Sequence, residues 1–236
     1  MDPTISRNLK KKDEAGSQPS RRLKPATAVT LSREMDMSIE DHQDALGAKL
    51  GMWLFILSEL LLFGGMFILY SAYRYKSPAD FHHASEELDV ILGTLNTLIL
   101  VTSSLTVAAS IAAIQKGQRR LSMVLLMATI ALGLFFLANK GLEWGTKIEH
   151  GIYPNSPALL TRGKGEILFF GLYYVMTGLH GLHVLIGVCI LFSMFILVTK
   201  RRLHPRRFTP LENSGLYWHL VDIIWIFLYP LFYLIT

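Results

Sequence analysis

The chain has 236 residues, of which 51% are hydrophobic and 17% are charged, with 23 Lys and Arg against 18 Asp and Glu. Soluble globular domains carry about 25% charged residues, so this composition argues against a water-soluble enzyme. The single cysteine, Cys189, excludes a disulfide framework and the cysteine-rich sites of structural zinc or iron–sulfur clusters. The net charge of +5 does not indicate nucleic-acid binding, because the basic residues lie between long apolar segments.

The first 48 residues are polar and basic, unlike the rest of the chain. Basic clusters at Lys10–Lys12 and Arg21–Lys24 lie among Pro, Ser, Thr and acidic residues, with too few apolar side chains to form a core. We expect residues 1–48 to form a mobile basic N-terminal tail. This tail is not a secretory signal peptide, because the first apolar segment begins late and is as long as a full membrane span.

Five long apolar segments follow, each near or above the roughly 20 residues that a helix needs to cross a bilayer. A backbone in the hydrocarbon region must satisfy its own hydrogen bonds, so we expect these segments to be helices. The sequence therefore predicts an all-α, polytopic membrane protein, a bundle of five transmembrane helices over residues 49–236. The predicted spans are about 50–73, 90–114, 121–144, 167–199 and 214–235.

The distribution of Lys and Arg predicts the orientation of the chain. If the N-terminus is cytoplasmic, the segments inside hold seventeen Lys and Arg and the segments outside hold six. Without the tail the bias falls to eight against six. The positive-inside rule therefore places the N-terminus in the cytoplasm and the C-terminus outside.

The first span contains one charged residue, Glu59, near its middle. An ionised carboxylate at this depth costs about 2.5–3.5 kcal/mol on insertion scales, so Glu59 should face the bundle and find a partner. We expect that partner to be His180 or His183 of the fourth span. Two interpretations stay open: a structural hydrogen bond between helices, and a role in proton handling or in contact with lipid or a partner subunit.

The second span carries small and polar residues on one broad face of its helix. Such a face allows close approach of the backbone and hydrogen bonds between helices. We therefore expect this face to pack against other spans. Its members are Gly93, Asn96, Ser103, Thr106 and Ser110.

Three histidines and one aspartate lie in the last two spans. His180 and His183 share one helix face, but a metal site normally needs three or four ligands. Hydrogen bonds to neighbouring helices are the simpler explanation, with a lipid-related or proton-related role and a metal as alternatives. His219 and Asp222 are one turn apart and can hold each other's charge, either for structure or in contact with a partner subunit.

Four further residues are expected at a membrane–water interface. Lys140 and Glu143 are three positions apart and can form an ion pair. Trp144 and Trp218 have side chains suited to the headgroup region. We expect these residues to anchor the helix ends, and a functional role for Glu143 is the alternative.

The chain contains no nucleotide-binding glycine loop, no HExxH motif and no CxxCH haem-attachment motif. Its spans also hold too few histidines and thiols for two haems and a copper centre. We therefore expect no catalytic, cofactor-binding or metal-ligating residue in this chain. A redox reaction, if the protein serves one, would take place on another subunit.

Five stretches, in the same order and spacing, give the membrane part of the chain a family resemblance. It resembles subunit III of the haem-copper oxidases, of the short five-helix bacterial type, across about residues 47–236. The N-terminal tail lies outside the resemblance. The stretches are WLFILSELLLFGGMF (53–67), LNTLILVTSSLTVA (95–108), GLEW (141–144), TGLHGLHVLIG (177–187) and YWHLVDIIWIFLYPLFYL (217–234).

The resemblance implies an accessory, non-catalytic subunit of a proton-pumping cytochrome c oxidase of aerobic electron transport, in the bacterial inner membrane. It implies packing on subunit I, with subunit II in the same complex. Haem and copper would lie on the partner subunits, while this chain would hold phospholipid and support proton uptake and durability during turnover. The family's intramembrane polar positions match Glu59, Glu143, His180, His183, His219 and Asp222.

Other assignments stay open. Lys140 stands where many oxidase members have a neutral residue, and this region is also similar to the accessory protein of nitric oxide reductases. A quinol oxidase subunit III has the same fold, so the sequence does not distinguish cytochrome c from quinol as the electron donor. A stand-alone transporter is disfavoured by the lack of internal repeats and of broken helix pairs. An assembly factor that is absent from the finished complex is a further alternative.

Overall fold

The computed structural model describes residues 25–203 and 208–235, with side chains from residue 46 onward. The chain divides into two units, residues 1–46 and 47–236. In the first unit the described residues are helical and belong to α2 (Pro25–Lys76). Residues 1–24 of the expected tail lie outside the described residues, so the mobility of that tail stays a prediction.

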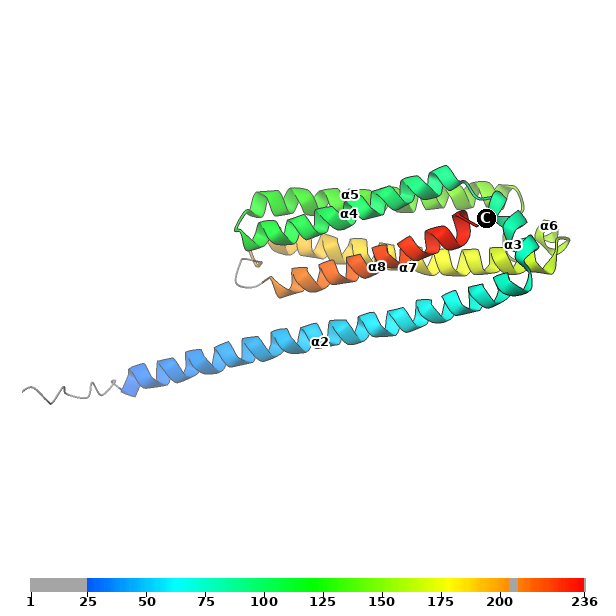
Figure 1. Cartoon of the computed structure of the whole chain (residues 1–236). Helices are drawn as coiled ribbons and strands as arrows, with labels where there is room; N and C mark the ends of the chain where they lie inside the picture. The colour runs from blue at the N-terminus through cyan, green and yellow to red at the C-terminus, as the bar shows by residue number, and fades with distance from the viewer. Residues whose placement is uncertain (1–24, 204–207, 236) are drawn as a thin grey trace, which may run out of the picture. The chain divides into compact units, whose positions relative to one another are not determined.

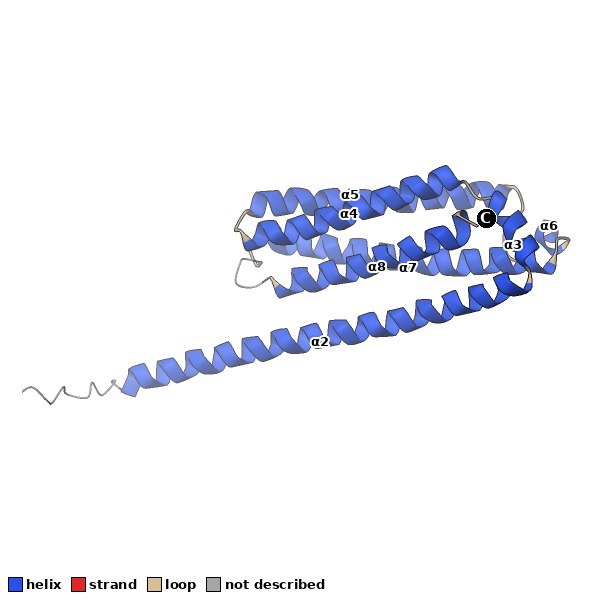
Figure 2. Cartoon of the chain, viewed as in Figure 1, coloured by secondary structure: helices blue, strands red, loops and turns tan. Residues whose placement is uncertain are grey.

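Five helices are long and apolar enough to cross a membrane, as predicted, and the described residues include no strand (Figure 2). Two short helices, α3 (Pro78–Glu86) and α6 (Pro157–Leu160), lie in connections at one end of the bundle (Figure 1). The chain is therefore an all-α, multi-pass membrane protein. The spanning segments are Leu46–Lys76 of α2, α4 (Val90–Gln115), α5 (Arg119–Glu149), α7 (Lys164–Thr199) and α8 (Thr209–Tyr233).

Four of the long helices form a closed ring around a shared core. α4 packs on α5, α5 on α7, α7 on α8, and α8 back on α4 (Figure 1). The core is rich in large aromatic side chains, among them the fully buried Trp218 and Trp225 of α8 and Phe136 of α5. Phe136 and Trp225 pack edge to face with ring centroids 4.8 Å apart. Such contacts stabilise the bundle beyond the burial of their area.

The membrane-spanning part of α2 packs against this ring through aromatic side chains. Phe55 stacks on Tyr217 of α8 at 5.8 Å between ring centroids. Tyr70 packs edge to face on Phe232 and donates a hydrogen bond to the carbonyl of Leu231. In the most apolar 18-residue stretch of α2, only 6% of the residues are buried, against 33–56% in the corresponding stretches of the other spans. Most apolar side chains of α2 are therefore available to lipid or to another protein.

Polar side chains join α4 to its neighbours, as its predicted small and polar face requires. Each bond satisfies groups that lipid cannot hydrogen-bond. The prediction for the second span is therefore confirmed. The bonds are Asn139 Nδ2 to Asn96 Oδ1 at 3.0 Å, Thr106 Oγ1 with Thr129 Oγ1 at 2.8 Å, Ser110 Oγ with Ser122 Oγ at 2.9 Å, and Trp218 Nε1 to Ser103 Oγ at 3.0 Å.

Candidate functional site

An ion pair between α2 and α7 joins Glu59 to one of its two expected partners, His183. Glu59 Oε2 lies 3.1 Å from His183 Nε2, and both side chains are largely buried. His183 Nδ1 lies 2.8 Å from the carbonyl oxygen of Leu179 and can only donate there. The contact of His183 Nε2 with the carboxyl of Glu59 then requires one proton, held by the carboxyl or by the imidazole. The two side chains therefore share one proton in this arrangement.

A hollow of 430 Å³ adjoins this ion pair, and His183 is one of its lining residues. Its other walls are largely apolar and come from α2, α7 and α8. Asn213, near the start of α8, also lines it. Its shape and chemistry suit an apolar chain better than a polar metabolite. The apolar lining includes Met52, Phe55, Ile186 and Ile190.

His180 does not share the partners of His183. Its ring is buried between Phe136 and Trp225, with centroids 5.5 and 5.1 Å away. Neither ring nitrogen has a hydrogen-bond partner among the described residues. Across those residues, no carboxylate or thiol joins the two histidines as a third metal ligand. Packing explains the place of His180 better than metal binding does.

His219 and Asp222 do not form the pair that their spacing allows. His219 Nδ1 instead lies 2.5 Å from Ser104 Oγ of α4. The carboxylate oxygens of Asp222 are buried without a hydrogen-bond partner in the part of the chain that the structure describes. The pair does not form because His219 Nδ1 is engaged by the hydroxyl of Ser104 on the neighbouring helix.

Lys140 and Glu143 form a salt bridge, as their spacing predicted, but it lies in the interior of the bundle. Lys140 Nζ is 3.0 Å from Glu143 Oε2 and also donates to the hydroxyl oxygens of Tyr173 and Tyr233, at 3.1 and 2.8 Å. Both tyrosine hydroxyls donate to Glu143 Oε1, at 2.7 and 2.6 Å. The four side chains therefore connect α5, α7 and α8 in one polar network.

The interior position of this network differs from the interface anchor that we expected. Lys140 and Glu143 are only 6% and 5% exposed. The predicted third span ends at residue 144, whereas α5 continues to Glu149. Lys140 therefore lies two turns inside the helix, where tyrosines of α7 and α8 surround it.

Of the two tryptophans expected at the interface, Trp218 lies in the core of the bundle, while the interface position of Trp144 stays a prediction. Trp144 is half-buried, and its ring packs against Tyr174 with 5.2 Å between centroids. Trp218 is fully buried because two glycines leave room for its ring. A Cβ at Gly133 would lie 2.6 Å from Trp218 Cη2, and one at Gly187 would lie 2.8 Å from Trp218 Cε3.

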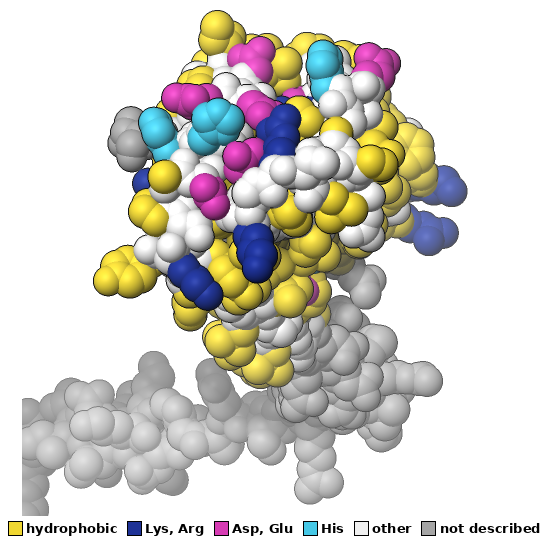
Figure 3. Space-filling model, turned by 90° about the vertical axis from the view of Figure 1, so that its right-hand side faces the viewer, with side chains coloured by type: hydrophobic (Ala, Val, Ile, Leu, Met, Phe, Trp, Pro, Cys, Tyr) yellow, Lys and Arg dark blue, Asp and Glu magenta, His cyan; other side chains and the backbone are white. Residues whose placement is uncertain are grey.

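Charged side chains gather at the end of the bundle that carries α3 and α6 (Figure 3). Arg162 forms ion pairs with Glu87 and with Glu166, the latter at 3.2 Å. The hydrogen bond to Glu87, with the nearby negative charges, raises the pKa of Arg162 above its usual value. His83 completes a cluster that the sequence analysis did not single out, although His83 and Glu87 have the i, i+4 spacing of one helix face.

Comparisons with known proteins agree with this arrangement. A family model described as cytochrome c oxidase subunit III matches residues 31–236. Cytochrome c oxidase subunit 3 of Thermostichus vulcanus is 33% identical over 192 residues, which cover 79% of this chain and 87% of that protein. A probable quinol oxidase subunit 3 of Staphylococcus haemolyticus is 27% identical, over 82% of this chain and 91% of its own length. The heme-copper oxidase subunit I+III of Aeropyrum pernix is 27% identical over 78% of this chain and 22% of its own length.

Proposed function

The chain belongs to the cytochrome c oxidase subunit III family, and on this basis we propose that it is the accessory subunit III of a proton-pumping respiratory cytochrome c oxidase. The observation that carries the proposal is the family match, which extends over the whole five-helix membrane domain. Relatives named cytochrome c oxidase subunit 3 match most of this chain. The complex would serve aerobic electron transport in a bacterial inner membrane, with the N-terminus of this chain in the cytoplasm.

Subunit I is the proposed direct partner, with subunit II in the same complex. The relative from Aeropyrum pernix is named as subunits I and III in one chain, which supports close association of the two. The exposed apolar side chains of α2 offer a surface for such contact. We place haem and copper on the partner subunits, and this chain takes no part in the redox chemistry.

The ion pair of Glu59 with His183 and the hollow beside it support two auxiliary roles. The hollow is open and largely apolar, and a phospholipid acyl chain fits its chemistry. The ion pair lies near the middle of the first span, where an ionisable side chain indicates a functional site by default. In this proposal the chain holds lipid, supports proton uptake by subunit I and prolongs the activity of the complex during turnover.

A quinol oxidase subunit III is the second candidate, because two relatives named probable quinol oxidase subunit 3 match about four-fifths of the chain. The two candidates share the fold and differ in the electron donor. Nothing in this chain is expected to contact the donor. The difference must therefore be measured on the complex.

Purification of the tagged chain from native membranes in mild detergent tests the proposal. We expect haem-containing subunits to co-purify, with a reduced-minus-oxidised haem spectrum and oxygen uptake from reduced cytochrome c. A complex prepared without this chain should lose activity sooner during turnover. Oxygen uptake from quinol alone would favour the second candidate, and a chain that purifies without haem would contradict both.

A further inference from the structure

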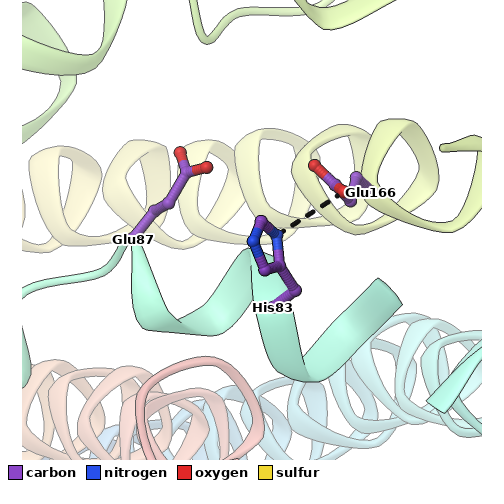
Figure 4. A group of neighbouring side chains, drawn as sticks. All are labelled: His83, Glu87 and Glu166. Atoms are coloured by element: carbon purple, nitrogen blue, oxygen red, sulfur yellow. Dashed lines mark ion pairs between the residues drawn. The ribbon is translucent and has the colours of Figure 1, made fainter. Parts of the chain in front are cut away.

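Three side chains at the α3 end of the bundle have ligand atoms that converge on one small volume (Figure 4). One nitrogen of His83 and one carboxylate oxygen each from Glu87 and Glu166 all lie within 4.8 Å of one another. His83 Nδ1 is 3.6 Å from Glu166 Oε1. The cluster shares no residue with the network around Lys140 or with the pair of Glu59 and His183, so it is a separate feature of the chain.

The helices that carry these side chains are held against each other. Asp80 Oδ2 of α3 accepts a hydrogen bond from Gly165 N in the first turn of α7, at 3.0 Å. A Cβ at Gly165 would lie 2.3 Å from that oxygen, so only glycine permits this approach. Lys147 Nζ of α5 donates to the carbonyl oxygen of Glu87 at 2.9 Å. The backbone positions of the cluster are thus fixed before any ligand binds.

The donor set suits a divalent transition metal. Zinc accepts imidazole nitrogen and carboxylate oxygen at about 2.0–2.2 Å, often with three protein ligands and a water. Ligand atoms around such an ion are roughly 3.3–3.5 Å apart, so these would have to approach by about 1 Å. The ring of His83 is exposed and can rotate to do so. Calcium and magnesium prefer oxygen ligands alone and fit less well.

A second observation also indicates a ligand. Glu87 Oε2 is buried and has no hydrogen-bond partner among the described residues. A buried carboxylate oxygen without a donor loses the hydrogen bonds that water would give it. The other oxygen of Glu87 is paired with Arg162, so Arg162 leaves one oxygen of this partly buried carboxylate without a partner.

We propose that His83, Glu87 and Glu166 bind Zn²⁺ or a similar divalent transition-metal ion, in competition with the guanidinium of Arg162. Arg162 pairs with both carboxylates, but it neutralises only one of their two negative charges. Lys147 lies close to Glu87 and offsets part of the remaining negative charge, although its Nζ donates to the backbone carbonyl of Glu87 and not to the carboxylate. What is left of that charge attracts a second cation. A metal ion supplies that positive charge and uses the imidazole, which Arg162 does not contact. This inference does not depend on the proposed oxidase function.

Zinc titration of the full-length chain, purified in detergent with the subunits that accompany it, tests the proposal. A chromophoric chelator of known affinity reports the free Zn²⁺. His83→Ala should weaken zinc binding at least about tenfold, because it removes the only nitrogen ligand. The matched control is His82→Ala on the same helix, since His82 faces Glu86 instead, at 3.7 Å. This control should bind zinc like the wild type, and sites on other subunits cancel in the comparison.

Arg162→Gln provides a result that a merely adventitious zinc site would not give. Removal of the competing positive charge should tighten zinc binding at least about tenfold, whereas Lys164→Gln next to it should have a small effect. Absorption of Co²⁺ in place of Zn²⁺ should show the bands of four-coordinate cobalt, and His83→Ala should remove them. Equal zinc binding by His83→Ala and His82→Ala would overturn the proposal. So would the absence of binding at about 100 µM zinc in folded wild-type protein.

Discussion

At the scale of single residues, the network around Lys140 predicts a large loss of stability when its cation is removed. Lys140→Met removes the cation and leaves the carboxylate of Glu143 buried with two tyrosine donors. Removing one partner of a buried ion pair costs about 3–5 kcal/mol, because the other charge stays uncompensated. We expect the free energy of unfolding in mixed detergent micelles to fall by this amount, as measured by loss of helical circular dichroism.

The double variant Lys140→Met with Glu143→Gln is the control for that prediction. It removes both charges while the glutamine keeps the shape and an acceptor for the tyrosine hydroxyls. Most of the lost stability should therefore return, since neutral replacement of a buried pair is often harmless. A single variant as stable as the wild type, or a double variant worse than the single one, would show that the charges do not depend on each other.

Some contacts of single residues could be predicted from the sequence, and others could not. The contact of Glu59 with His183 was predictable because a lone carboxylate at mid-membrane depth is costly and few partners exist in the spans. The burial of Trp218 was not, because it depends on Gly133 and Gly187, which come from two other helices. Spacing along one helix gives candidate pairs, but only the packing of neighbours decides which of them form.

At the scale of helices, close packing around Trp218 predicts unequal effects of the same substitution on α5. Gly133→Ala places a methyl group 2.6 Å from the ring of Trp218, which is fully buried and cannot move aside. Overpacking of this kind costs about 1–3 kcal/mol. Gly141→Ala is the matched control, because nothing lies within 4 Å of its Cβ position.

The control should keep or raise stability by less than about 1 kcal/mol, since alanine favours the helix over glycine. Thermal unfolding of the two variants in one detergent compares them directly. Equal melting temperatures would mean that the core around Trp218 is loose. A loss in both variants would instead indicate that glycine is needed throughout α5.

Helix number and order could be predicted from apolar length alone, and so could the ends of α4 to within one residue, but the C-terminal end of α5 could not. The apolar runs mark only the parts that lipid surrounds, whereas α5 continues beyond its apolar run to Glu149. That extension ends where Gly151 adopts a positive φ of 73°, a turn that the apolar pattern does not signal. The network of Lys140 could not be predicted either, because it depends on Tyr173 of α7 and Tyr233 of α8.

At the scale of the whole molecule, the membrane domain has one well-packed ring and one helix with a largely exposed surface. The ring of α4, α5, α7 and α8 buries its polar groups among its own side chains. By contrast, only 6% of the residues in the most apolar stretch of α2 are buried. Leu54, Leu61 and Ile68 of α2 are each about two-thirds exposed or more. Such a surface is stable in lipid and is also available to a partner subunit, so the proposed assembly needs no rearrangement of the ring.

The orientation of the whole chain yields the last prediction, because its single cysteine makes labelling simple. Cys189→Ser gives a cysteine-free background, to which Thr161→Cys or Gln118→Cys is added. Both positions are exposed and lie in connections at opposite ends of the bundle (Figure 1). With the N-terminus in the cytoplasm, an impermeant maleimide should label intact cells through Thr161→Cys alone. Gln118→Cys should react only after permeabilisation, and the reverse pattern would place the cluster of His83, Glu87 and Glu166 in the cytoplasm.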